Sequence, residues 1–197
     1  MKGQYHATPP VIDDHHDAEV LIDSRGRQAV YVSGNLVSVS TSITRPADVN
    51  AYAAGDVVAD ATSNPTVTVF AGCARSVGEA GHLVQVILVD SANQATKGLY
   101  ELWLFSATYG QDADNAVFTP TDAECATLQA IIPLNTSYVG DATAGAVGNA
   151  VYTSGSIDIP FVCAAAQTSL WGALVVRNAY TPVSAEVFTM TLVLDQE

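Results

Sequence analysis

The chain has 197 residues, of which 49% are hydrophobic and only 14% are charged, and its mean hydropathy is +0.23. This composition is too apolar for a disordered protein, and the length suits one large β domain or one domain with an arm. Twenty acidic against seven basic residues give a formal net charge of −13. Phosphate repels such an acidic chain, so nucleic-acid binding is not expected.

The apolar runs and the cysteines narrow the expected location of the protein further. The longest apolar run, residues 161–166, is far shorter than the roughly 20 residues that a membrane-spanning helix needs, so no membrane partner is expected. The N-terminus lacks the apolar stretch of a signal peptide, so export by that route is not expected. Cys73, Cys125 and Cys163 are odd in number and widely spaced, which argues against disulfides or a zinc knuckle and favours a reducing cytoplasm.

The first 27 residues differ from the rest of the chain. Two prolines stiffen an extended segment, and five acidic residues between positions 13 and 23 precede the first clear strand. We therefore interpret residues 1–27 as an extended N-terminal arm, which becomes ordered through contact with a partner. Residues 28–197 are interpreted as a single domain. The arm residues expected to touch that partner are Tyr5, Pro9, Pro10, Val11 and Ile12.

From Ala29 onward the pattern is that of β-strands. Residues 29–33 and 36–44 flank Gly34 and Asn35, which suit a type II′ hairpin turn, and valines alternate with serines in the second strand. Residues 83–90 are apolar on both faces, which predicts a central strand followed by an exposed hairpin loop at 91–98. Other strands are expected at 56–58, 66–71, 100–106, 151–153, 157–162, 170–177 and 186–194.

One segment is typical of a helix. Thr121 and Glu124 form a capping box, Cys125, Leu128 and Ile132 follow at helical spacing, and Pro133 ends the pattern. Many short strands and a single short helix predict an all-β fold. Its form is an antiparallel β-sandwich of jelly-roll or Greek-key type.

Two groups of residues suggest metal binding but lack the required spacing. His15 and His16 lie among Asp13, Asp14 and Asp17, but adjacent residues of an extended chain point in opposite directions, so a solvated arm is expected. A cation held by these histidines at a symmetry axis remains an open alternative. Residues 112–123 begin like a calcium loop but lack its later ligands, so an Asx turn is expected there. No metal site is predicted.

No catalytic constellation is found in the sequence. Neither a Gly-x-Ser-x-Gly elbow nor a phosphate-binding loop occurs, and His82 is expected at a strand edge or in a loop. The three cysteines are expected to be buried and inert, and Trp103 and Trp171 to pack in the core. We therefore predict no catalytic residue, no cofactor and no enzyme activity.

Tyrosines in loops are the candidates for contact with a partner. Tyr52, Tyr109, Tyr138 and Tyr180 lie in segments expected to be loops, and aromatic side chains are enriched in protein interfaces. Tyr52 and Tyr180 are the two that we single out as partner-binding residues.

Four stretches of the sequence together resemble small structural proteins of tailed bacteriophages: residues 44–60, 91–105, 114–118 and 178–184. The resemblance implies a virion protein, most plainly a capsid decoration or cement protein. Such a protein is made in the host bacterial cytoplasm, binds the major capsid protein on the outer surface of the head and is commonly a homotrimer. The alternative is a tail, baseplate or fibre-associated module that binds a host surface glycan.

Overall fold

The computed structural model describes residues 21–22, 28–29, 35–92, 94, 96–134, 136–139 and 148–197. The chain divides into two units, Met1–Ser33 and Gly34–Glu197. In the first unit, β1 (Leu21–Ile22) pairs with β2 (Gln28–Ala29) in antiparallel fashion. The predicted boundary between arm and domain, at residue 27, stays a prediction.

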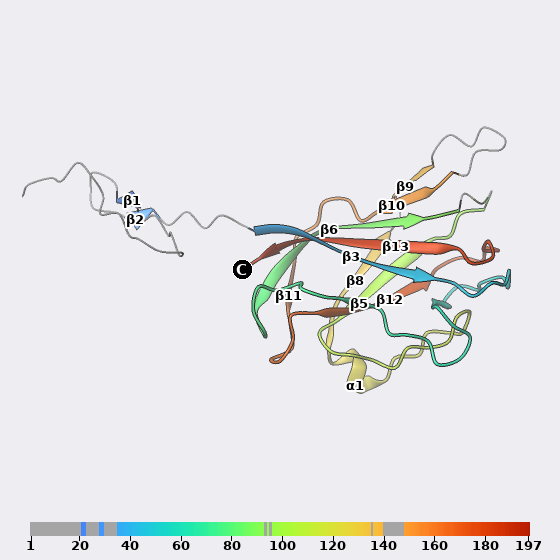
Figure 1. The fold of residues 1–197 in the computed structure, drawn as a ribbon, viewed down its shortest axis with the longest axis horizontal. Helices are drawn as coiled ribbons and strands as arrows, with labels where there is room; N and C mark the ends of the chain where they lie inside the picture. The colour runs from blue at the N-terminus through green and yellow to red at the C-terminus, as the bar shows by residue number, and fades with distance from the viewer. Residues whose placement is uncertain are drawn as a thin grey trace, which may run out of the picture. The chain divides into compact units, whose positions relative to one another are not determined.

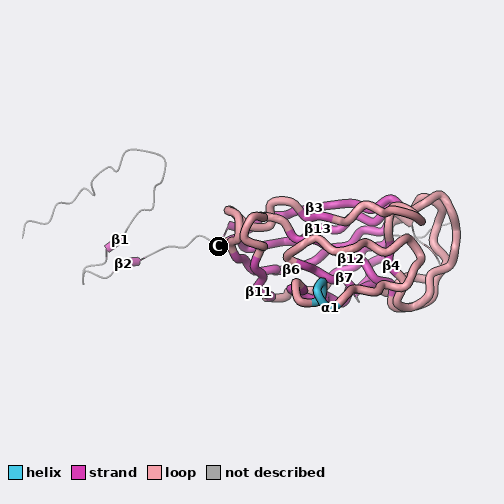
Figure 2. Tube along the Cα trace, turned by 90° about the horizontal axis from the view of Figure 1, so that it is seen from below, coloured by secondary structure: helices cyan, strands magenta, loops and turns pink. Residues whose placement is uncertain are grey.

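The second unit is a sandwich of two antiparallel β-sheets (Figures 1 and 2). The first sheet has the order β3-β13-β6-β10-β9 with β11 beside β6, and the second has the order β4-β12-β7-β8 with β5 beside β12. This order, in which early and late strands lie side by side, is that of a jelly roll, and it confirms the predicted fold class. The bounds are β3 Asn35–Thr44, β4 Val57–Val58, β5 Val69–Phe70, β6 Ala80–Asp90, β7 Tyr100–Phe105, β8 Leu128–Leu134, β9 Thr136–Val139, β10 Ala150–Thr153, β11 Ile159–Val162, β12 Leu170–Val176 and β13 Val187–Gln196.

The main core lies between the two sheets. Strand β13 supplies Phe188, Met190, Leu192 and Leu194, all 0% exposed, in the alternation that the sequence predicts. Burial of each such side chain contributes roughly 1.5–3 kcal/mol, which makes this layer the main source of stability. The facing residues of the second sheet include Val58, Phe70, Leu102, Leu104, Leu170 and Leu174.

The second sheet is covered on its outer face as well. The connection between β7 and β8 supplies Tyr109, whose hydroxyl donates a hydrogen bond to the carbonyl of Gly172 at 2.8 Å. It also supplies Phe118, whose ring centroid lies 5.3 Å from that of Trp103. Trp103 and Trp171 pack half-buried in this second apolar cluster, rather than between the sheets.

The predicted helix forms over only four residues, α1 (Asp122–Cys125). Its capping box is present, because Glu124 Oε2 accepts from the amide of Thr121 at 2.7 Å and the amide of Glu124 donates to Thr121 Oγ1 at 3.3 Å. The expected continuation to Ile132 is wrong, since β8 pairs there with β7. Pro133 is tolerated in β8 because this strand ends its sheet, where a missing N–H can face away from the ladder.

Of the two predicted hairpins, the one at Gly34 and Asn35 lies largely outside the described residues, and the one at residues 91–98 is wrong. Ala29 pairs with Leu21, and β3 pairs along its whole length with β13, while residues 30–34 lie outside the described part. Residues 91–98 join β6 in one sheet to β7 in the other, so they form a crossing and not a hairpin loop. A local turn signal cannot show whether the strands on either side share a sheet.

Candidate functional site

Three connections meet at one end of the sandwich, which we call the loop end: residues 45–56, 91–99 and 177–186. The sheet register places them together, because Val187 pairs with Thr44 and Phe188 pairs with Asp90. Backbone bonds join them further, since the amide of Arg45 donates to the carbonyl of Glu186 at 2.9 Å. The loop end therefore holds polar groups that come from distant parts of the sequence.

Arg45 is the centre of a buried polar cluster at the loop end. Its Nη2 lies 2.9 Å from Asp114 Oδ2, and its Nε donates to the hydroxyl of Tyr52 at 2.5 Å. That hydroxyl donates in turn to Asp114 Oδ1, which also accepts the amide of Ala59 at 3.0 Å. Burial lowers the pKa of Arg45, but Tyr52 and Asp114 outweigh this effect and raise it above its usual range. The cluster fastens two loops to the sandwich.

A pair of buried carboxyl groups lies beside this cluster. Asp90 is 0% and Glu186 1% exposed, and Asp90 Oδ1 accepts the amide of Ala92 at 2.8 Å. Burial, together with the hydrogen bond and the charge of Glu186, raises the pKa of Asp90 well above its usual range. Glu186 accepts from Gln94 Nε2 at 2.6 Å and from the amide of Val183 at 3.2 Å, which links two of the three loops.

Tyrosine side chains enclose the carboxyl pair. Tyr100 makes edge contacts with Tyr152 and Tyr180, at centroid distances of 5.0 and 6.0 Å. The charge of Asp90 helps to raise the pKa of all three tyrosines, after the larger effect of burial. The ammonium group of Lys97 donates a hydrogen bond to the carbonyl of Gln94. Its positive charge acts to lower the pKa of Asp90 and so partly offsets the rise. The carboxyl pair, Tyr100 and Tyr152 are buried in the interior, whereas Tyr180 and Gln94 also reach the wall of a surface pocket.

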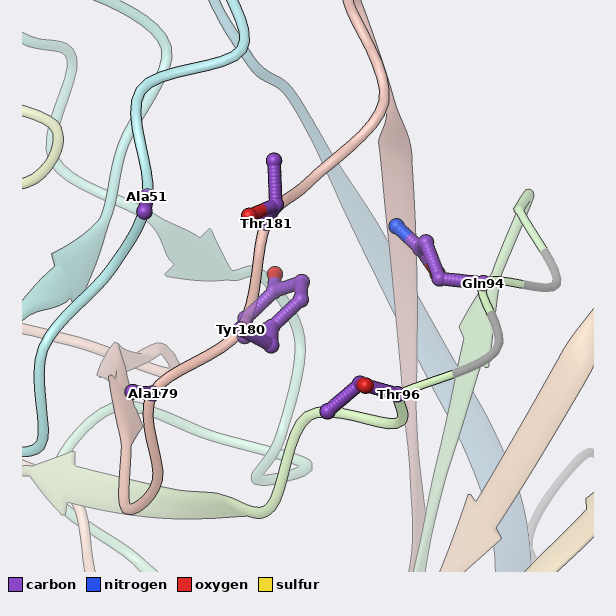
Figure 3. A pocket seen from close by; sticks show the side chains of 6 residues that line it. All are labelled: Ala51, Gln94, Thr96, Ala179, Tyr180 and Thr181. Carbon is purple, nitrogen blue, oxygen red and sulfur yellow. The ribbon is translucent and has the colours of Figure 1, made fainter.

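A pocket of about 400 Å³ opens on the surface of the loop end. In Figure 3, Gln94 and Thr96 lie on one side and Tyr180 and Thr181 on the other, with Ala51 and Ala179 completing the wall. None of these six lining residues carries a charge at neutral pH. The pocket could receive a neutral polar group through hydrogen bonds, but its lining offers no acid and base pair for catalysis.

The structure places the predicted contact tyrosines inside the molecule. Tyr52 and Tyr180 stack at a centroid distance of 5.3 Å, and they are only 1% and 3% exposed. Tyr109 is likewise buried. Tyr180 nevertheless lines the pocket at the loop end, and the partner contacts predicted for Tyr52 and Tyr180 stay predictions.

The other predicted contacts fall in the arm or beyond the described side chains. Tyr5, Pro9, Pro10, Val11 and Ile12 lie outside the described residues. The same holds for His15, His16 and the side chain of Tyr138. The partner contacts predicted for these residues stay predictions.

Two other candidate residues have structural roles. Asp112 Oδ2 accepts the amide of Thr119 at 2.8 Å, as a turn-forming residue does. His82 lies in β6, and its Nδ1 is 2.6 Å from Asp158 Oδ1, a contact that raises the pKa of this histidine. Within the described part of the chain, no three metal-type ligands cluster and no helix is long and apolar enough to cross a membrane.

The cysteines differ from one another. Cys73 and Cys163 are buried, and burial raises the pKa of Cys73 to about 12, as expected of inert thiols. Cys125 is exposed, so the prediction of a buried thiol is wrong there. The reason is that α1 ends at Cys125 on the surface and buries no residue.

The outer face of the first sheet is the broadest feature that the sequence did not single out. We call it the neutral face, because none of its residues between the two ends of the sheet is charged. On it, Ser40 Oγ lies 2.8 Å from Thr191 Oγ1, and Ser42 Oγ lies 2.9 Å from Thr189 Oγ1. Its members are Ser38, Ser40, Ser42, Gln85, Ile87, Val89, Val151, Thr153, Thr189, Thr191 and Val193.

Replacing Asp114 by Asn tests the buried cluster. The variant leaves the buried Arg45 guanidinium without its main counter-charge, and we expect the free energy of unfolding to fall by about 3 kcal/mol. Asp48→Asn is the matched control, because Asp48 is partly exposed and 3.4 Å from the same guanidinium. Its loss is expected to stay below about 1 kcal/mol. Urea unfolding measures the free energy of unfolding of both variants. Equal losses of stability would contradict the assignment of Asp114 as the main counter-charge of Arg45.

Replacing Asp90 by Asn tests the buried carboxyl pair. Because the pKa of Asp90 is raised on folding, the folded protein keeps a proton above about pH 4 that the unfolded chain releases. The stability of the folded protein therefore falls as the pH rises above about 4, until Asp90 ionises in the folded state. Urea unfolding at pH 5 and pH 8 should give a flatter pH dependence for Asp90→Asn than for the parent. The exposed control Glu79→Gln should keep the parent slope, and parallel curves for all three proteins would refute the assignment.

Comparison with known proteins adds no family. No family model matches the chain, and no curated protein matches it. The described residues therefore provide two features for a functional argument, the neutral face of the first sheet and the pocket at the loop end.

Proposed function

We propose that this chain is a structural protein of a phage virion that decorates the outer surface of the head. In this role it binds major capsid subunits and stabilises the contacts between them. The proposal starts from the resemblance of residues 44–60, 91–105, 114–118 and 178–184 to such proteins. The structural observation that supports it is the neutral face, which is broad, uncharged and built on a rigid sheet.

The neutral face suits adhesion for an energetic reason. Burying a charged group requires a compensating partner, whereas serine and threonine hydroxyls that already bond to one another can be covered at lower cost. The half-buried side chains of Ile87, Val89 and Val151 add apolar area to the same face. Each bound copy would then stabilise the shell by mass action, and the arm would add a second point of attachment.

The remaining surface has a different task in this proposal. Twenty acidic residues keep free copies soluble and repel the phosphate of packaged DNA, which favours the outside of the shell. Attachment then depends on the neutral face, where acids are absent between the two ends of the sheet.

Charges placed on the neutral face test the proposal. Ile87→Glu and Ile87→Lys should each lower occupancy of shells that lack this protein by at least tenfold, because either sign leaves a buried charge unpaired. The controls are Val117→Glu and Val117→Lys, since Val117 is 61% exposed on the loop that covers the other sheet. Co-sedimentation with shells measures occupancy, and thermal unfolding checks the fold. Full occupancy by both Ile87 variants would exclude the neutral face as the attachment surface.

The second candidate function is a tail-associated module that binds a host glycan, and the loop-end pocket favours it. The pocket presents the amide of Gln94 and the hydroxyls of Thr96 and Thr181, which are groups that bond to sugars. Copy number separates the two functions: a decoration protein should match the major capsid protein in abundance on a gel of whole virions. A scarce chain would support the tail-associated module instead.

A further inference from the structure

Among the described strands, none pairs with one of the two edges of β3. It ends the first sheet and pairs on one side with β13 over all ten residues. No other described strand pairs with its second side. Along that side, alternate residues present backbone N–H and C=O groups that another strand could bond to.

The other edges of the described sandwich carry features that prevent pairing. Strand β8 contains Pro133 and β11 contains Pro160, each of which lacks an N–H. Strands β4 and β5 have only two residues each, and β9 has four. Strand β3 has ten residues, contains no proline and no charged residue, and pairs with β13 without a bulge. The strand itself therefore carries none of the sequence features, such as proline, charge or a bulge, that keep an edge unpaired.

The inner face of β3 is less well covered than that of its neighbour. Val37 and Val39 are half-buried, whereas Leu192 and Leu194, opposite them on β13, are 0% exposed. At the start of β3, Leu36 is 66% exposed. A strand added to the open edge would cover the flank of these side chains and extend the sandwich.

We propose that the open edge of β3 pairs, antiparallel, with β3 of a second copy of this chain, about a two-fold axis at Ser40. In this register Ser40 faces its own copy and Val37 faces Ile43, so inward residues meet inward residues on both sides. The charge of the chain favours this occupant. Two copies with net charge −13 repel wherever acids face each other, and β3 brings none into the contact.

This contact goes beyond the proposed function and is independent of shell binding. It predicts a two-fold dimer, in place of the homotrimer that the resemblance implies. It also joins two neutral faces on the same side of one continuous sheet, because an antiparallel pair about such an axis keeps the faces aligned.

A disulfide at Ser40 tests the register. In a Cys125→Ser background, which removes the exposed native thiol, Ser40→Cys should form a covalent dimer under mild oxidation. Thr191→Cys is the matched control: Thr191 shares the hydrogen bond with Ser40 but lies one strand inward, so it should stay uncrosslinked. Equal crosslinking of the two variants, or none at Ser40, would overturn the proposed register.

A charge at Ser40 tests the association itself. Sedimentation equilibrium of the full chain should give a dimer, and Ser40→Lys should weaken it at least tenfold, while Thr191→Lys should not. Thermal unfolding shows whether both variants fold. A trimer, or a monomer at all concentrations, would overturn the proposal. If the β3 amides of that monomer also resisted hydrogen exchange, another part of the same chain would be covering this edge.

Discussion

The apolar layer between the two sheets is the interaction on which the rest of this structure depends. Strand β13 contributes every second side chain from Phe188 to Leu194 to this layer. Strands β12 and β7 contribute the facing side chains from the other sheet. Since the inward set of each strand is fixed by this layer, the outward set is fixed too. The neutral face exists because the residues that alternate with the core residues are hydroxyls and small apolar groups instead of acids.

At the loop end, hydrogen bonds between buried polar groups hold the chain in place, as apolar packing does in the middle of the sandwich. Asp114 and Glu186 accept hydrogen bonds from several loops at once, and the charges involved are enclosed together with their partners. The raised pKa of Asp90 belongs to this arrangement, because burial and the neighbouring Glu186 both disfavour a second negative charge in that enclosure. These hydrogen bonds thereby fix the loops in place.

The sequence predicted those features that depend on local alternation, and it failed where distant contacts decide. Alternating residues in β3 and β13 showed both the strands and their inward faces, and the Thr121 and Glu124 capping box was found correctly. In contrast, the spacing of Leu128 and Ile132 fits a helix and a strand equally well, and only pairing with β7 decides between them. Tyr52 lies in a loop as predicted, but its burial could not be foreseen, because the fold brings its partners Arg45 and Asp114 to it. The neutral face has no motif, since it arises from four strands far apart in the chain.

The covering of the second sheet by the β7–β8 connection gives the sandwich two sides whose residues are held by packing to different degrees. Tyr109 and Phe118 hold this connection down, and residues between them, such as the exposed Val117, contribute little to the core. If the first sheet faces a partner, this connection faces solvent. Changes of sequence or length between its anchoring rings could then give each variant a new outer surface while the joint beneath stays the same.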